Sequence, residues 1–343
     1  MRKPPGIKDV AALAGVSPST VSVVLNAVDG ARVAEDTRQR VTEAAAALGY
    51  EPNPLARGLR TRRTQTIGFI SDLVASTPYA GRMIQGVQDV AWRAGMLLIL
   101  VETSGDAQLE QHAIRTLLHR QVDGVLYASF YHRVVEVPQL RRGFPMVVVD
   151  GRPDGASVPY VIPDEVAGAS AAVTELLEHG HRRIGFVAER DDIPAVEARM
   201  RGYRESLSRY GVPFDPALVM REVSDTHGGH RAVSRLLDLP EPPTGVFCFN
   251  DRTAMGAYRA AAERGLRIPD DLSVVGYDDQ ELIASSLSPG LTTVALPHYE
   301  MGAWAVKHLL GLIDGAAAVT DQPLQMLMPC PLVRRDSVGP PAH

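Results

Sequence analysis

The chain has 343 residues, of which 45% are hydrophobic and 22% charged, a balance that excludes disordered and fibrous proteins. Its two cysteines, Cys248 and Cys330, are too few for a disulfide framework and indicate buried thiols in a reducing compartment, with the cytoplasm as the default. The longest apolar run, Met96 to Val101, is far shorter than the roughly 18 residues that cross a bilayer. We therefore expect neither secretion nor membrane insertion.

The net charge of −5 is unevenly distributed along the chain. Residues 1 to 63 hold ten Lys and Arg against six Asp and Glu, a balance of +4, which leaves 25 against 34, or −9, for the remainder. A basic first segment on an acidic body indicates a polyanion-binding module joined to another domain, although a solvated charged face gives the same count.

Two short helices are predicted at the start of the chain. Apolar residues recur with helical spacing from Ile7 to Ala14, and residues 15–17 interrupt them. Ser17 is a favourable N-cap and Pro18 suits the first helical position, where its missing N–H costs nothing, so a second helix should run to Leu25.

A third helix is expected over residues 35–48, ending at Gly49. Ala11, Gly15 and Val21 fall where a helix-turn-helix needs a small residue, a turn residue and an apolar anchor. The second helix carries short polar side chains suited to phosphate and base-edge contacts: Ser17, Ser19, Thr20, Ser22 and Asn26. We favour DNA binding, with a purely structural three-helix bundle as the alternative.

A short segment follows this unit. Asn53 and Pro54 again pair an N-cap with a first helical position, but residues 55–60 can form only about two turns, with Gly58 at their centre. We expect a disordered linker here. It is either a linker alone or a helix that becomes ordered on DNA and wedges an apolar side chain into the minor groove.

From Thr66 onward, short apolar runs alternate with amphipathic helical stretches, and the series restarts near residue 183. The expected strands cover residues 67–71, 96–101, 124–127, 146–149, 183–187, 245–249 and 274–277. A βαβ pattern repeated twice predicts an α/β fold with two parallel-sheet lobes covered by helices on both faces. Ligands bind at the carboxyl ends of such strands, where this sequence places polar residues.

Four segments in fixed order resemble the LacI/GalR family of transcriptional regulators: IKDVA (7–11), AGVSPSTVS (14–22), LGYEPNPLAR (48–57) and TIGFI (66–70). The resemblance implies a hinge helix in the linker, paired across a dimer, with Leu59 as the wedging leucine. It implies contacts to DNA from Ser17, Pro18, Ser19, Thr20, Ser22, Val23, Asn26, Arg57 and Leu59. Val23 stands where many members carry arginine, so the operator should differ from the usual one, and Ala34 replaces a common N-cap serine.

The resemblance continues to about residue 336 through EHGHRRI (178–184), FND (249–251), VVGYDD (274–279) and LTTV (291–294). It implies an N-terminal helix-turn-helix three-helix domain plus a periplasmic-binding-protein-like core of two doubly wound parallel-sheet lobes. We expect a DNA-binding domain at residues 1–50 and a hinge at 51–64. The N-terminal lobe is expected at residues 65–163 and 291–320, the C-terminal lobe at 164–290 and 321–337, and a tail at 338–343.

The family's core holds a small effector between its lobes. By resemblance, the effector-binding residues are Thr77, Tyr79, Asp150, Asp164, Arg199, Asn250, Asp251 and Asp278. Carboxylates with one arginine and one amide can grip vicinal hydroxyls, which favours a sugar or related polar metabolite and leaves a nucleoside open. Asn250 and Asp251 can instead cap the helix that follows them, without touching a ligand.

We therefore expect a homodimeric repressor in the cytoplasm, associated with the nucleoid, that binds a double-stranded inverted-repeat operator under control of a small effector. A dimer is expected rather than a tetramer, because no leucine heptad follows Pro331. No catalytic motif or metal-ligand spacing is found, so we expect no enzyme, cofactor, metal or membrane partner. The alternatives are a small-molecule-binding protein without regulatory DNA binding and an enzyme on a doubly wound fold.

Overall fold

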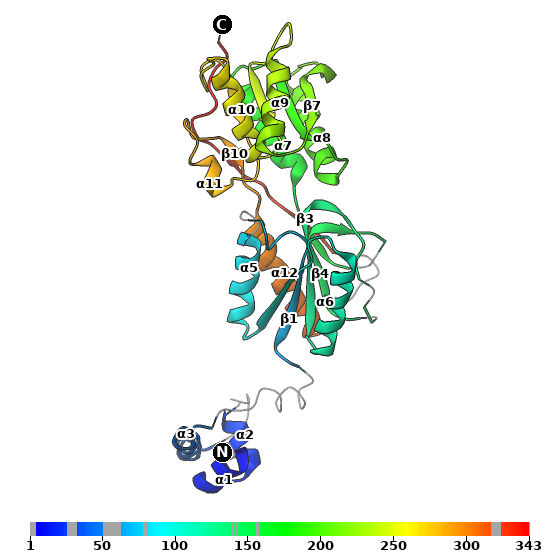
Figure 1. The fold of residues 1–343 in the computed structure, drawn as a ribbon. Coiled ribbons are helices and arrows are strands. Elements are labelled where there is room, and N and C mark those ends of the chain that lie inside the picture. Colours follow the sequence, from blue (N-terminus) through cyan, green and yellow to red (C-terminus); the bar gives the residue numbers. More distant parts are fainter. Residues whose placement is uncertain are drawn as a thin grey trace. The chain divides into compact units, whose positions relative to one another are not determined.

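The computed structural model describes residues 5–25, 33–50, 63–77, 81–138, 140–141, 143–155, 158–316 and 324–342. The chain divides into two compact units, Met1–Gln65 and Thr66–His343, which we call the head and the core (Figure 1). Within the described ranges, no single helix is long and apolar enough to cross a membrane. The first two helices meet that criterion only as a pair, bent by 101°.

The head is a bundle of three helices, α1 (Ile7–Ala14), α2 (Pro18–Leu25) and α3 (Glu35–Leu48), as the helical periodicity predicts. Their apolar faces meet in a small core, in which Val10, Val21 and Val41 have no exposed surface. Burial of these side chains supplies the apolar contact that three short helices need, since helices of this length are marginal in water by themselves.

Local residues end the helices of the head where the sequence predicts. Gly15 follows α1 with φ 66° and Gly49 follows α3 with φ 60°, a left-handed conformation that costs glycine little. Ala34 precedes α3 without a side-chain hydrogen bond, as its methyl group requires. Most of the expected hinge, residues 51–62, lies outside the described residues.

The first lobe of the core, called the N-lobe, contains a six-stranded parallel sheet in the order β11-β5-β4-β3-β1-β2. Its strands are β1 (Thr66–Ser71), β2 (Leu97–Glu102), β3 (Gly124–Val135), β4 (Met146–Pro153), β5 (Tyr160–Pro163) and β11 (Gln325–Met328). Helices α5 (Gly81–Arg93) and α12 (His298–Ile313) share a buried cluster with Phe69 and Val147 on one face. Helix α6 (Ala107–His119) packs on the other face through Leu117, beside Val148. Side chains alternate between the two faces, so both need an apolar cover.

The second lobe, called the C-lobe, has a four-stranded parallel sheet in the order β7-β6-β8-β9. These strands are β6 (Ile184–Glu189), β7 (Val219–Glu222), β8 (Gly245–Cys248) and β9 (Ser273–Val275). One buried cluster joins α7 (Glu165–Glu178) and α8 (Pro194–Arg209) to the sheet, and a second joins α9 (Thr226–Leu237) and α10 (Asp251–Glu263). Short helices η2 (Pro216–Leu218) and α11 (Glu281–Ala284) complete the lobe.

Two strands near the end of the chain lie in the opposite lobe to the one expected. Strand β10 (Thr293–Val294), expected in the N-lobe, continues the C-lobe sheet through a bridge between Val275 and Thr292 and pairs with β12 (Leu332–Val333). Strand β11, expected in the C-lobe, pairs with β5 in the N-lobe sheet. Both expectations are wrong because hydrogen bonding to a distant strand, which local pattern does not encode, places these segments.

The chain therefore passes between the lobes three times: after β5, between β10 and α12, and between β11 and β12. Hydrogen bonds join these connections, from Asp164 N to Met328 O and from Ala295 N to Pro331 O, each at 2.8 Å. The three adjacent connections bring the carboxyl ends of the two sheets close to each other. Open parallel sheets bind ligands at the carboxyl ends of their strands.

Candidate functional site

Helix α2 begins at a side-chain cap. The Ser17 Oγ accepts a hydrogen bond from Thr20 N at 3.1 Å, and Pro18 occupies the first helical position. The prediction that Ser17 caps this helix is confirmed. The cap also holds the short side chains together, since the Ser17 and Ser19 hydroxyl oxygens lie 2.7 Å apart.

The same end of α2 faces solvent. Val21 and Val24 bury its other side, whereas Ser17, Pro18 and Ser19 are exposed and Thr20, Ser22 and Val23 are half-buried. An exposed helix N-terminus with short hydroxyl side chains can donate to phosphate and base edges. The other expected DNA contacts, Asn26, Arg57 and Leu59, lie outside the described residues.

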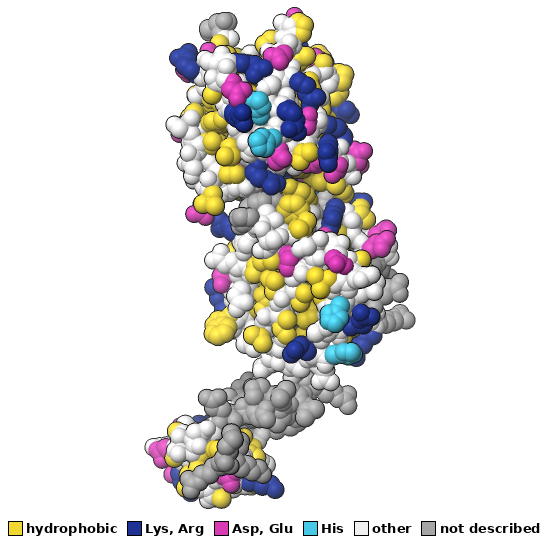
Figure 2. Space-filling view, in the orientation of Figure 1, with side chains coloured by type: hydrophobic (Ala, Val, Ile, Leu, Met, Phe, Trp, Pro, Cys, Tyr) yellow, Lys and Arg dark blue, Asp and Glu magenta, His cyan; other side chains and the backbone are white. Residues whose placement is uncertain are grey.

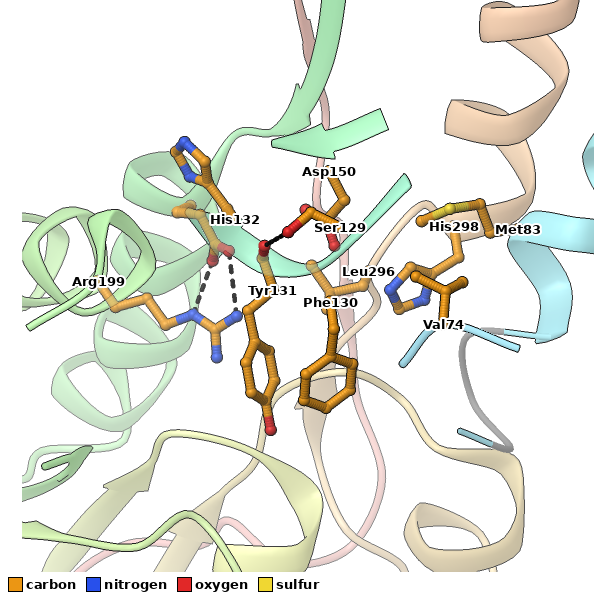
Figure 3. Close-up of a pocket in the computed structure, with 11 residues that line it drawn as sticks. Val74, Met83, Ser129, Phe130, Tyr131, His132, Asp150, Arg199, Leu296 and His298 are labelled. Atoms are coloured by element: carbon orange, nitrogen blue, oxygen red, sulfur yellow. Dashed lines mark hydrogen bonds and ion pairs between the residues drawn. The ribbon is translucent and has the colours of Figure 1, made fainter. Parts of the chain in front are cut away.

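A cavity lies in the core where the lobes adjoin (Figure 3). Its volume is small, about 10 Å³, and a neighbouring cavity of about 940 Å³ shares two of its lining residues. The N-lobe, the C-lobe and one connection between them all line it, through Val74, Met83, Ser129, Phe130, Tyr131, His132, Asp150, Glu165, Arg199, Leu296 and His298. In Figure 3, Arg199 lies on one side of Tyr131 and Phe130, and His298 lies on the other. Two of the eight expected effector residues, Asp150 and Arg199, are thus brought into one cavity.

Asp150 is the buried acidic group of the N-lobe side. It lies in β4 with φ 56°, and its side chain is only 5% exposed. Burial, reinforced by the nearby Glu165 and Asp278 carboxylates, raises the pKa of Asp150 well above its ordinary value, although Arg199 opposes this. Its Oδ1 atom has no hydrogen-bond partner within the described part of the chain, so it can accept from a ligand or, when protonated, donate to one.

Arg199 is the cation of the C-lobe side, and groups of its own lobe surround it. Its Nε and Nη2 atoms donate to the two Glu165 oxygens at 2.7 and 3.1 Å, and Nη1 donates to Phe249 O. The guanidinium stacks on the rings of Phe249 and Tyr277, 4.3 and 3.6 Å from their centroids. Burial lowers the pKa of Arg199, but the neighbouring Glu165 carboxylate raises it further, so the net shift is upward and Arg199 stays charged.

Thr77 and Asp278 line a neighbouring cavity that shares Leu296 and His298 with the first. The Asp278 carboxylate accepts a hydrogen bond from Gln280 Nε2 at 2.9 Å. Burial raises the pKa of Asp278 to about 6, while Arg199 and the Gln280 hydrogen bond lower it. Asp150 and Asp278 therefore both carry protons more readily than ordinary carboxyl groups.

Three of the remaining expected effector residues, Asn250, Asp251 and Asp164, make hydrogen bonds within the C-lobe. Asn250 caps α10 by accepting from Thr253 N at 2.8 Å, which is the role that local sequence allows it. Asp251 accepts from Gln280 N and from the Thr293 hydroxyl, both at 2.6 Å. Asp164 caps α7 and lines neither cavity, whereas Tyr79 lies outside the described residues.

The cavities are also lined by polar residues that were not predicted from the sequence, among them Tyr131, His132, Glu165, Arg252 and His298. The Tyr131 hydroxyl accepts a hydrogen bond from Arg252 Nη2 at 2.8 Å, which joins the N-lobe to the C-lobe. For Tyr131 and His132 the available signal was the aromatic run at residues 130–132, separated by two residues from the expected strand at 124–127, since β3 continues to Val135.

His132 and His298 add neutral groups to the cavity wall. Burial lowers the pKa of both, that of His298 to about 4, so each ring offers one donor and one acceptor near neutral pH. Neither ring nitrogen of His132 has a hydrogen-bond partner among the residues that the structure describes. The wall that the two cavities share thus presents both hydrogen-bond donors and acceptors to a ligand.

Two protein families match parts of this chain. Bacterial regulatory proteins of the lacI family match residues 6–53, and the periplasmic binding protein-like domain matches residues 173–338. These ranges fall on the head and on the part of the core that begins in α7.

Individual proteins are similar over nearly the whole length. The ribose operon repressor of Haemophilus influenzae is 36% identical over 305 residues, covering 89% of this chain and 90% of that protein. The transcriptional repressor CytR of Escherichia coli is 35% identical over 332 residues, covering 96% and 95%. A solved structure, the Lac repressor dimer bound to operator and the anti-inducer ONPF, aligns with a TM-score of 0.79 at 27% identity, covering 98% of this chain and 100% of that one.

Proposed function

This chain belongs to the lacI family of bacterial regulatory proteins, and on that premise we propose that it binds an inverted-repeat operator as a homodimer and that a small polar effector between its lobes sets its DNA affinity. Like its relatives, it is a DNA-binding transcriptional repressor with a metabolite-binding domain, and it is not an enzyme. Because the proposed target is chromosomal operator DNA, we place the protein with the nucleoid in the cytoplasm.

The observation that carries the proposal for DNA is the division of α2 into two faces. Val21 and Val24 pack into the head, which leaves the Ser17 to Ser19 end free to enter a major groove. One head covers one half-site, so two heads related by a twofold axis require an inverted repeat. Val23 supports an operator without the guanine contact that an arginine would make.

Exposed apolar side chains support the homodimer. Trp92 is 74% exposed in α5 and Leu97 is 63% exposed in β2, which forms an open edge of the N-lobe sheet. Figure 2 shows apolar side chains gathered on this face of the N-lobe, between the helices labelled α5 and α6 in Figure 1. In the C-lobe, Leu282 of α11 is 79% exposed. Patches of this kind mark protein interfaces, and an uncovered sheet edge favours association.

The two adjoining cavities support the effector. They lie beside the three connections between the lobes, and Leu296 of one connection lines both. A ligand that binds Asp150 in one lobe and Asp278 in the other changes the balance between lobe arrangements, and by linkage it changes DNA affinity. The related ribose repressor makes a sugar the first choice, with a nucleoside as the second.

The test is selection of bound duplexes from a random pool by the full-length protein at moderate salt, followed by sequencing. We expect an enriched inverted repeat, and sedimentation of the complex should give two chains per duplex. Failure to enrich any repeat, with and without a metabolite mixture, contradicts the proposal.

A pair of matched variants locates the DNA-reading surface. Ser19→Ala on the exposed end of α2 should weaken binding to the selected duplex by up to about tenfold, the value of one charge-assisted hydrogen bond. Thr42→Ala on the exposed face of α3 removes the same hydroxyl group elsewhere in the head and should leave binding unchanged. Equal losses in the two variants would point to stability of the head rather than contact with DNA.

A further inference from the structure

The arginine at the cavity is already neutralised by the protein. All three nitrogens of Arg199 donate to Glu165 or to Phe249 O, and the guanidinium lies over the rings of Phe249 and Tyr277. Arg199 is 2% exposed and Glu165 is 3% exposed. A bidentate pair at this burial is the strongest arrangement open to a guanidinium, so an anionic ligand would have to displace Glu165 to use Arg199.

Most of the other polar groups that line the same cavity are acceptors or neutral donors. Asp150 faces it with an Oδ1 atom that has no partner within the described chain, and the same holds for both ring nitrogens of His132. His298 also lines the cavity, and Asp278 lines the adjoining one. Around the one Arg199 there are thus three carboxyl groups, those of Asp150, Glu165 and Asp278.

A phosphate or carboxylate at this cavity would meet Asp150 and Glu165, and Arg199, the one Arg or Lys among the described residues that line it, is already paired. Arg82 and Arg252 line the adjoining cavity. A hydroxyl or amino group would instead donate to Asp150 and exchange hydrogen bonds with His132. Burial strengthens this discrimination, because charges interact more strongly where water is excluded.

We propose that Glu165 determines effector specificity by occupying Arg199, so that the end of the cleft at Arg199 accepts a hydroxyl or amino group of a polyhydroxylated or nucleoside-like effector and rejects a phosphate or carboxylate there. This proposal rests on the effector role proposed above for the cleft. It deepens that role by naming the side chain that sets the charge class of the ligand.

The experiment compares full-length wild type with Glu165→Gln, which keeps the length and one acceptor of the side chain but removes its charge. Inorganic phosphate is the probe, with binding followed by thermal shift against sodium chloride at the same ionic strength. In Glu165→Gln the charge that neutralises Arg199 is gone, so the guanidinium can pair with phosphate. We expect this variant to bind phosphate about tenfold more tightly than wild type.

Two further variants isolate the cause. Glu175→Gln makes the same change in the same helix at a carboxylate that is 4% exposed and accepts from Arg334 Nε at 2.8 Å, outside both cavities. It should bind phosphate as wild type does. The double variant Glu165→Gln with Arg199→Met should lose the gain, since the cation is gone.

Neutral probes complete the test: ribose and a nucleoside, each beside its phosphomonoester. Wild type should bind the neutral member of a pair, and Glu165→Gln should shift toward the phosphorylated one. No phosphate gain in Glu165→Gln, a gain that survives in the double variant, or equal wild-type binding of both members overturns the proposal. If the phosphate gain is found but no neutral probe alters operator binding by wild type, the assignment of Glu165 stands and a sugar or nucleoside effector fails.

Discussion

On the C-lobe side of the cavity, Arg199 is bound by Glu165 and Phe249, whereas on the N-lobe side Asp150 and His132 are buried with polar atoms that have no partner among the described residues. The C-lobe groups are satisfied by the folding of their own lobe. The N-lobe groups are not, and a buried polar group without a partner costs about 1–3 kcal/mol. A ligand that supplies the missing hydrogen bonds recovers part of that cost. We therefore infer that the N-lobe groups gain stabilisation when an effector binds, whereas the C-lobe groups are already held in place without it.

The largest expected change in stability comes from comparing variants that each remove one group, Arg199 from the C-lobe side or Asp150 from the N-lobe side. Arg199→Met leaves Glu165 charged and buried in the C-lobe, and we expect the free energy of unfolding to fall by about 3–5 kcal/mol at pH 7. Asp150→Asn keeps the size of a side chain whose charged form burial already disfavours, and it breaks no hydrogen bond of Oδ1, so its cost should stay below about 1 kcal/mol. Urea unfolding followed by circular dichroism measures both. Equal losses would mean that Asp150 is as firmly bound as Arg199.

The pH dependence of stability gives an intermediate test. The pKa of Asp278 is raised by burial from 3.8 to about 6, so the folded protein retains a proton that the unfolded chain releases. The free energy of unfolding should therefore fall as the pH rises from about 4 to about 6, by at most about 3 kcal/mol. Above about pH 6 the contribution of Asp278 should no longer change with pH. Asp278→Asn should remove that part of the fall in unfolding experiments across this range.

The neighbouring carboxylate provides the control. Asp279 accepts from Arg335 Nη2 at 2.7 Å, so Asp279→Asn changes the same backbone region and the same formal charge. We expect the free energy of unfolding of Asp279→Asn to change with pH between 4 and 6 as that of wild type does. If Asp279→Asn and Asp278→Asn flatten the curve equally, the slope belongs to the charge of the region and not to buried Asp278. The same measurement on Asp150→Asn should also flatten the curve, because burial raises that pKa in the same direction.

Local chemistry made the head predictable. The Ser17 cap, the Pro18 start and the left-handed Gly49 depend on residues within a few positions of each other, and the structure has each as the sequence predicts. The apolar runs likewise predicted seven strands of the core. Strands β5 and β7 were missed because their apolar runs are interrupted: β5 has three apolar residues before Pro163, and β7 has two before Arg221 and Glu222. Strands β10 and β11 were assigned to the wrong lobes because pairing with distant strands places them.

The cavity was predictable only in part. Resemblance to a family identified Asp150, Arg199 and Asp278, and local sequence identified the capping role of Asn250. The ion pair between Arg199 and Glu165 could not be predicted from local sequence, since Glu165 is 34 residues away and belongs to another helix. That contact decides whether the arginine is free for a ligand, so the residue types alone left the charge class of the effector open.

The smallest expected effect concerns the hydrogen bond that joins the two sides. Tyr131→Phe removes the hydroxyl that accepts from Arg252 Nη2 and keeps the ring, which should cost about 1 kcal/mol of unfolding free energy. Tyr160→Phe removes a comparable hydroxyl, which donates to Gln325 Oε1 at 2.8 Å between β5 and β11 inside the N-lobe. The two losses in stability should be similar, but only Tyr131→Phe weakens a contact between lobes. Small-angle X-ray scattering should therefore give a larger radius of gyration for Tyr131→Phe than for Tyr160→Phe. Identical scattering would mean that the lobes are held together by the three chain connections and not by the contacts across the cavity.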